Sequence, residues 1–277
     1  MAMTAALAPM TPISETSAAR PAIGAALHAS RAQSAIKWRG MKPVGIFRHS
    51  PTEGPGYFAT YLERRSIKWQ LIGLDEGAGV PRDPRRFSGL VFMGGPMSVN
   101  DPLPWISPVL ELIREAVRKD LPVLGHCLGG QLVSKAFGGA VAANAVKEIG
   151  WGEVRVADNA LAREWLGGVQ SFEAFHWHGE TFSIPPGGTR LLESAHCPNQ
   201  AFALGKHLGM QCHVEMTPQL VESWLKTGAD EIRASSSSPG VQQPEEIQKD
   251  LHDRLAAMHE VANRLYDRWT KGLSPGS

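Results

Sequence analysis

From Met41 onward, short apolar runs alternate with stretches in which apolar residues recur at helical spacing. The apolar runs predict strands over Pro43–Arg48, Trp69–Leu74, Leu90–Met93 and Pro122–Gly125. The stretches between them predict helices over Gly56–Arg65, Ser107–Lys119 and Gly129–Phe137. Strands that alternate with helices are typical of a mainly parallel open sheet with helices on both faces. The pattern therefore predicts an α/β fold.

The pattern changes after Lys147, where the apolar runs become shorter and β-like. These runs predict an antiparallel excursion that contains Gly152–Val156, Arg190–Ser194, Ala201–Leu204 and Gly209–Cys212. The segment SSSSPG, residues 235–240, consists of turn residues and predicts a flexible break. Beyond the break, apolar residues three and four apart predict a C-terminal amphipathic helix over Pro244–Lys271.

Three segments follow from this reading of the chain. Residues 1–40 are rich in Ala, Ser, Thr and Pro without a sustained period, and we expect a disordered N-terminal extension. Residues 41–234 form the predicted α/β domain, and residues 235–277 form a Ser/Pro/Gly linker and the C-terminal helix. We expect the apolar face of that helix to pack on the domain, and the alternative is a homodimer interface.

Composition and charge exclude several classes of partner. The chain has 28 basic and 27 acidic residues and a net charge of +1, so its overall field attracts neither nucleic acid nor an anionic membrane. No stretch approaches the roughly 20 apolar residues that span a bilayer. The three cysteines lack CxxC spacing, which favours a reducing compartment over a disulfide framework. We expect a soluble, cytoplasmic protein.

Candidate chemistry begins with GHCLGGQ, in which Cys127 lies between glycines after a predicted strand and before a predicted helix. The pattern matches a nucleophile elbow, where flanking glycines allow a strained turn to raise the nucleophile above the end of the strand. Backbone N–H groups at the start of the helix then point toward the thiol, where they can lower its pKa and stabilise an oxyanion. The alternative is a buried structural cysteine.

A zinc site is a further alternative for the same cysteine. Its candidate ligands are Cys127, His126, His176, His178, Cys212 and His213. Their spacing does not match the closed ligand sets of structural zinc sites, so we predict no metal site. For His176 and His178 we expect pocket-lining or structural roles.

A cysteine nucleophile needs a base and a group that orients the base. In QCHVE, His213 and Glu215 are two residues apart, so an extended chain places both side chains on one face. Cys212 would point to the opposite face and is expected to be structural.

A further motif, VFMGGP, contains Gly94 and Gly95 after another predicted strand. These glycines allow a close backbone approach at the edge where open α/β sheets bind ligands. The alternative is a plain tight turn.

Together, VFMGGP, GHCLGGQ and QCHVE resemble, in this order, the class I (triad-type) glutamine amidotransferase family, over roughly Met41 to Leu225. FHWHGETFSIPPG and KEIGW are similar to stand-alone members that resemble the amidotransferase half of GMP synthetase. The resemblance implies a flavodoxin-like amidotransferase fold. It also implies hydrolysis of glutamine through a thioester, with no metal or organic cofactor.

The resemblance also implies a role for each matching residue. Cys127 would attack the γ-carboxamide of L-glutamine, His213 would shuttle the proton and Glu215 would orient His213. The backbone N–H groups of Gly95 and Leu128 would form the oxyanion hole. The substrate-binding residues implied by the same likeness are Gly94, Gln131, His178, Gly179 and Glu180.

The sequence departs from the family pattern at one position, and it allows more than one function. Val214 stands where many relatives have proline, which leaves that turn less constrained. No ATP-pyrophosphatase loop or GxxxxGK[ST] motif occurs, so a separate synthetase subunit is the expected receiver of ammonia. A γ-glutamyl-peptide hydrolase would use the same residues on a larger leaving group. The non-enzymatic alternative is a glutamine-binding or regulatory module that needs a partner.

Overall fold

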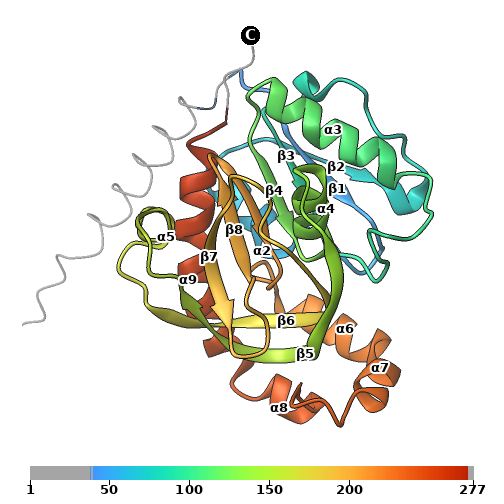
Figure 1. The fold of residues 1–277 in the computed structure, drawn as a ribbon, viewed down its shortest axis with the longest axis vertical. Coiled ribbons are helices and arrows are strands. Elements are labelled where there is room, and N and C mark those ends of the chain that lie inside the picture. The colour runs from blue at the N-terminus through green and yellow to red at the C-terminus, as the bar shows by residue number, and fades with distance from the viewer. Residues whose placement is uncertain (1–37, 39, 274–277) are drawn as a thin grey trace, which may run out of the picture.

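The computed structural model describes residues 38 and 40–273, and Figure 1 shows them as one sheet with helices on either side. The sheet has ten strands, in the order β10-β5-β7-β8-β9-β4-β3-β1-β2, and β6 pairs with β5. The strands are β1 (Val44–Arg48), β2 (Trp69–Gly73), β3 (Gly89–Phe92), β4 (Val123–His126), β5 (Val141–Val156), β6 (Ser171–Phe182), β7 (Thr189–Ser194), β8 (Ala201–Leu204), β9 (His207–Met210) and β10 (Gly240–Val241). The helices are α2 (Gly56–Arg64), α3 (Ile106–Arg118), α4 (Leu128–Ala136), α5 (Ala160–Leu166), α6 (Pro218–Thr227), α7 (Ala229–Ala234), α8 (Pro244–Gln248) and α9 (Leu251–Thr270), with short 3-10 turns at Leu74–Glu76 and Pro84–Arg86.

The parallel part of the sheet confirms the α/β prediction. β2, β1, β3, β4 and β9 run parallel to one another. The predicted strands and helices between residues 43 and 137 are present, with ends displaced by one residue or less. The carboxyl ends of β1, β3, β4 and β9 therefore meet at one edge of the sheet.

Side chains alternate between two cores along each parallel strand. On β4, Leu124 packs into the core formed with α2, α5 and α9, whereas Val123 packs into the core formed with α3 and α4. On β3, Val91 and Phe92 divide in the same way. Burial on both faces explains why these strands are continuous apolar runs in the sequence.

The predicted antiparallel excursion is present and larger than the sequence indicated. β7, β8 and β9 pair antiparallel in succession, and β7 pairs antiparallel with β5. Gly152–Val156 is only the end of the 16-residue strand β5, which pairs along most of its length with β6. The prediction missed β6 as a strand, because its residues read as a pocket-bordering segment with no simple alternation.

The C-terminal segment packs on the domain, as expected, but it is two helices rather than one. The single helix predicted over Pro244–Lys271 is interrupted between α8 and α9, where Asp250 has a positive φ of 53°. The indole Nε1 of Trp151 donates to the carbonyl oxygen of Ile247 at 3.0 Å, so a group outside the helix satisfies this carbonyl near the end of α8. Figure 1 shows α9 lying along the sheet next to α5.

The segment expected to be a flexible linker is tied to the sheet. Residues 235–239 form turns, and Gly240–Val241 pairs parallel with Glu148–Ile149 of β5. Ser238 Oγ also donates to the carbonyl oxygen of Lys147 at 2.9 Å. The predicted extension over residues 1–40 lies almost entirely outside the described residues. In the described part of the chain, no helix combines the length and apolar character needed to cross a bilayer.

Candidate active site

Cys127 lies on the sharp turn between β4 and α4, at the carboxyl edge of the parallel strands. Its φ of 49° and ψ of −109° are a strained conformation for a residue with a side chain. The neighbouring glycines are needed for packing, since a Cβ on Gly125 would collide with the backbone of Gly129, and one on Gly129 would collide with the carbonyl oxygen of Phe92. The local geometry is that of the predicted elbow.

His213 and Glu215 follow β9, the strand beside β4, so the sheet brings them to Cys127. The Nδ1 atom of His213 lies 2.6 Å from Oε1 of Glu215, and both side chains are buried. The second carboxylate oxygen of Glu215 lies 2.9 Å from Nδ1 of His126, the residue before Cys127. The Val214 backbone therefore allows the expected histidine–carboxylate contact without a proline.

The charges of these groups reinforce one another. Burial disfavours the imidazolium form of His213, but the negative charges and hydrogen bonds of Glu215 and Cys127 outweigh burial and hold its pKa well above 6.5. Burial likewise opposes the carboxylate form of Glu215, but His126 and His213 hold its pKa well below 4.5. The arrangement favours a proton on His213 and a charge on Glu215.

The β1–α2 loop, the first turn of α2 and α6 hold this pair from the other side. The N–H of Tyr57 donates to the carbonyl oxygen of Glu215 at 2.7 Å. The indole of Trp224 donates to the carbonyl oxygen of Thr52 at 2.8 Å and packs edge-on against His213, with ring centroids 4.8 Å apart. His213 thus has little freedom to leave its position.

The two glycines after β3 lie close to the start of α4 on one side and to His213 on the other. A Cβ on Gly95 would lie 2.8 Å from Cδ2 of Leu128, which is the first residue of α4. A Cβ on Gly94 would lie 2.6 Å from Oε2 of Glu53 and 3.4 Å from Cε1 of His213. Gly95 lines the cavity beside Cys127, whereas Gly94 lies behind it, against His213.

Gln131 is one turn of α4 beyond Cys127, and its amide connects two walls of the site. Its Nε2 donates to Oε1 of Gln211 at 3.2 Å and to the carbonyl oxygen of Glu180 at 3.4 Å. Nε2 of Gln211 in turn lies 3.5 Å from Sγ of Cys127. The carboxylate of Glu180 accepts from Ser98 at 3.0 Å, so the segment after β3 is also tied to β6.

These elements enclose a cavity of about 580 Å³. Its lining contains Cys127 and His213 together with most of the predicted substrate-binding residues, namely Gln131, His178, Gly179 and Glu180. The remaining lining residues are Thr52, Glu53, Gly95, Pro96, Met97, Ser98, Lys147, Trp177, Trp224, Thr227, Gly228 and Glu231. A volume in this range is typical of ligand pockets.

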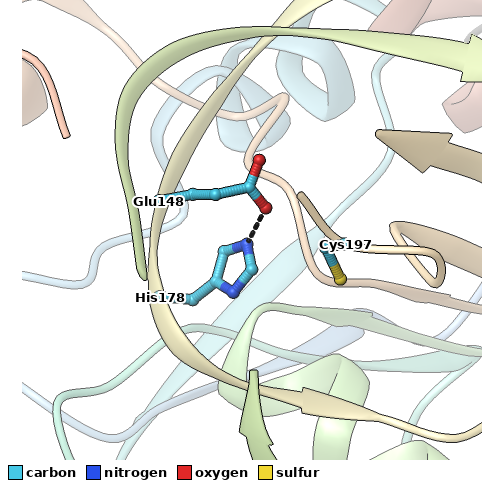
Figure 2. A group of neighbouring side chains, drawn as sticks. All are labelled: Glu148, His178 and Cys197. Atoms are coloured by element: carbon cyan, nitrogen blue, oxygen red, sulfur yellow. Dashed lines mark ion pairs between the residues drawn. The ribbon is translucent and has the colours of Figure 1, made fainter. Parts of the chain in front are cut away.

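His178 has a buried polar environment on the side away from the cavity. Figure 2 shows its imidazole and the carboxylate of Glu148 pointing toward each other, with Cys197 on a neighbouring loop, and the Nε2–Oε2 distance is 3.1 Å. Ligand atoms of these three residues lie within 4.8 Å of one another, as in a metal site. The carboxylate, however, already accepts hydrogen bonds from Ser194 at 3.1 Å and Gln200 at 2.9 Å. We therefore interpret the group as a hydrogen-bonded support for His178.

The two other histidine and cysteine candidates are buried away from the cavity. Burial lowers the pKa of His176 to about 4, which favours a neutral imidazole, and one of its ring nitrogens lies 3.3 Å from Nε2 of Gln200. Cys212 is fully buried and does not line the cavity, and burial holds its pKa well above 9.

The sequence prediction gave no role beside the triad to four residues that the structure places there: His126, which it named only as a candidate zinc ligand, Gln211, Glu53 and Trp224. His126 and Gln211 lie inside the two motifs, so adjacency to Cys127 and His213 was an available signal. Glu53 and Trp224 come from the β1–α2 loop and from α6, and no local pattern connects them to Cys127.

Comparisons with known proteins agree with this arrangement. The sequence model of the family described as "Glutamine amidotransferase class-I" matches residues 58–229. The glutamine amidotransferase-like protein YfeJ of Salmonella typhimurium is 31% identical over 193 residues, which cover 66% of this chain and 80% of that protein. GMP synthase of Thermomicrobium roseum is 35% identical over 130 residues, which are 46% of this chain and 23% of that enzyme.

Two crystal structures share the fold. A glutamine amido transferase from Methylobacillus flagellatus has a TM-score of 0.83 and 43% identity, and the match covers 86% of this chain and 97% of that one. A glutamine amidotransferase from Thermotoga maritima has a TM-score of 0.74 and 26% identity, covering 83% of this chain and 99% of that one. The chain described here belongs to the class I glutamine amidotransferase family.

Proposed function

We propose that the protein is a cysteine-dependent amidohydrolase that cleaves the γ-amide of glutamine or of another γ-glutamyl compound. The observation that carries the proposal is the meeting of three features at one cavity: Cys127 on its strained turn, His213 beside it, and Glu215 2.6 Å from the far nitrogen of His213. This combination supplies a nucleophile, a base and a group that orients the base.

In the proposed reaction, His213 takes the thiol proton and Cys127 attacks the γ-carbonyl carbon. The backbone N–H groups of Gly95 and Leu128 hold the oxyanion. His213 then gives the proton to the leaving nitrogen, the C–N bond breaks, and a γ-glutamyl thioester remains. Water, deprotonated by His213, splits the thioester to glutamate and restores the thiol. The amino-acid end of the substrate is bound by Gln131, His178, Gly179 and Glu180. Gly94 lies behind Gly95, whose N–H group belongs to the oxyanion hole.

The partner of the reaction is a second part of the proposal. GMP synthases contain a matching segment, and the chain spans about a quarter of the length of these relatives. By analogy, a separate synthetase subunit would receive ammonia from this protein. Hydrolysis of γ-glutamyl peptides is the competing enzymatic function, and a silent glutamine-binding module is the non-enzymatic one.

The experiment measures glutamate release from L-glutamine by the purified chain. We expect release by the wild-type protein and none by Cys127→Ala. Glu222→Gln serves as the control, because Glu222 is exposed and does not line the cavity. A diazoketone analogue of glutamine should alkylate Cys127 alone: the thiolate displaces N2, and the protein gains the mass of the reagent less that of N2. Absence of both release and labelling, with a folded protein, would contradict the proposal.

A further inference from the structure

The cavity around Cys127 has two sides that different elements build. On one side, hydrogen bonds join Ser98, Gln131 and Glu180, and the proposed function places the amino-acid end of the substrate there. The other side is next to His213 and is formed by the β1–α2 loop, α6 and α7. Because His213 must protonate the leaving nitrogen, the leaving group has to lie on this second side.

Glu53 is an acidic residue of the second side that lies close to His213. A Cβ built on Gly94 would lie 2.6 Å from Oε2 of Glu53 and 3.4 Å from Cε1 of His213. The side chains of Glu53 and His213 therefore approach the same point next to Gly94. The Glu53 carboxyl also lines the cavity. Its loop is fixed through the contact of Thr52 with Trp224, so the carboxyl is held beside His213 rather than on a mobile arm.

The Glu53 carboxyl has no direct partner among the described residues, although the charge of His213 acts on it. Nothing in the described part of the chain forms a hydrogen bond or an ion pair with its carboxyl group. The other acids near the cavity differ in this respect, since Glu231 is bound by Lys147 and by the indole of Trp177, and Glu215 contacts His213. Glu53 therefore offers an acceptor that a ligand can use.

We propose that the region around Glu53 is a leaving-group subsite, and that it takes γ-glutamyl amides of amines that carry a second, positively charged amino group. The inference rests on the proposed function, because it assumes that Cys127 opens a γ-glutamyl amide. It narrows the substrate class from any γ-glutamyl compound to those with a cationic leaving group.

Electrostatics favours this class over γ-glutamyl peptides. A peptide leaving group brings a carboxylate toward Glu53, and Lys147, the lysine in the cavity lining, is already engaged by Glu231. Burial, with a smaller opposing effect of His213, raises the pKa of Glu53 to about 7 in the unliganded site. An ammonium group placed there stabilises the charged carboxylate, so binding and ionisation support each other.

The cavity has room for such a substrate. Its volume of about 580 Å³ is in the range that accommodates drug-sized ligands, and a free amino acid fills only part of it. Thr52, Thr227 and Trp224 line the same side and add hydroxyl and aromatic surface rather than a further cation. An aromatic face beside an ammonium group is favourable as well.

The test compares two substrates of equal reach and opposite charge: the γ-L-glutamyl monoamide of ethylenediamine and γ-L-glutamylglycine. The full chain is assayed for glutamate release, and kcat and KM are determined separately. We expect kcat/KM to be about 10- to 100-fold higher for the diamine derivative, mainly through KM, as a charge-assisted hydrogen bond predicts. Glu53→Gln keeps the shape without the charge and should bring the ratio close to one. Glu53→Asp should retain a preference.

Glu222→Gln is the matched control, because Glu222 is an exposed acid of α6 outside the cavity, and its ratio should equal that of the wild type. A wild-type ratio near or below one would overturn the inference, and so would a high ratio that survives in Glu53→Gln. In both cases Cys127-dependent turnover persists and the proposed function stands. If neither substrate nor glutamine is cleaved and Cys127 is not labelled, the proposed function fails and the subsite falls with it.

Discussion

Substitution of Glu215 by glutamine tests the geometry of the site most directly. The change keeps the size of the side chain and removes one buried negative charge, which faces Nδ1 of His213 at 2.6 Å and Nδ1 of His126 at 2.9 Å. Breaking a buried ion pair costs on the order of 3–5 kcal/mol, and a glutamine oxygen can retain one neutral hydrogen bond. We therefore expect the free energy of unfolding to fall by about 3 kcal/mol.

The effect on turnover should be large as well. The Glu215 carboxylate counters the effect of burial, which lowers the pKa of His213. Without the carboxylate, the pKa of His213 falls and its tautomer is no longer specified. We expect kcat for glutamate release to fall at least ~100-fold, which corresponds to about 2.7 kcal/mol of activation free energy. The assay uses saturating L-glutamine, with urea unfolding of the same samples.

The difference in unfolding free energy between the wild type and Glu215→Gln should depend on pH. The pKa of Glu215 is held below 4.5, so its contribution to stability is present above that pH and is lost as pH falls. The pKa of His213 is held above 6.5, so its contribution is present below that pH and is lost as pH rises through the folded value. The stability difference between wild type and Glu215→Gln should thus be largest between about pH 4.5 and 6.5, and should shrink toward pH 3.

Exposed Glu63 provides the control, because Glu63→Gln should change neither stability nor kcat. A folded Glu215→Gln protein that keeps kcat within about tenfold of the wild type would refute the orienting role of Glu215. A stability difference that grows in acid would show that the carboxylate is not the charged partner described here.

Further predictions concern the elbow, the thiols and the C-terminal helix. Gly129→Ala should cost at least ~2 kcal/mol in urea unfolding, because its Cβ collides with the backbone of β3, while Gly79→Ala, in open space, should be neutral. In the native protein, a small alkylating reagent should modify Cys127 and leave the fully buried Cys212 unmodified until denaturant is added, as peptide mapping will show. Trp269→Ala should lower the free energy of unfolding by about 3–5 kcal/mol if α9 is part of the core, whereas a helix detached from the domain would tolerate it.

Much of the α/β framework was predictable because its signals are local. The continuous apolar runs over β1, β3 and β4 and the helical spacing over α2 and α3 each lie within a short window. The elbow at Cys127 was predictable for the same reason, since the glycines that permit the strained turn are its immediate neighbours. His213 and Glu215 followed from a two-residue spacing after a strand.

Other features depend on which distant segments the sheet places side by side. At the break before α9, the carbonyl of Ile247 is satisfied by the indole of Trp151, far away in the sequence, and β6 becomes a strand by pairing with β5. Neither partner is visible in a short window, so the predicted single helix was wrong and β6 was missed.

The site divides in the same way. The sequence by itself determined the candidate nucleophile and its base, because chemistry and spacing lie together in two short motifs. Only the tertiary structure brought His126 to Glu215 and Glu53 to His213, because β4 and β9 are neighbours and the β1–α2 loop closes over their ends. The order of strands in a sheet is set by the packing of the whole core, and no local period encodes it.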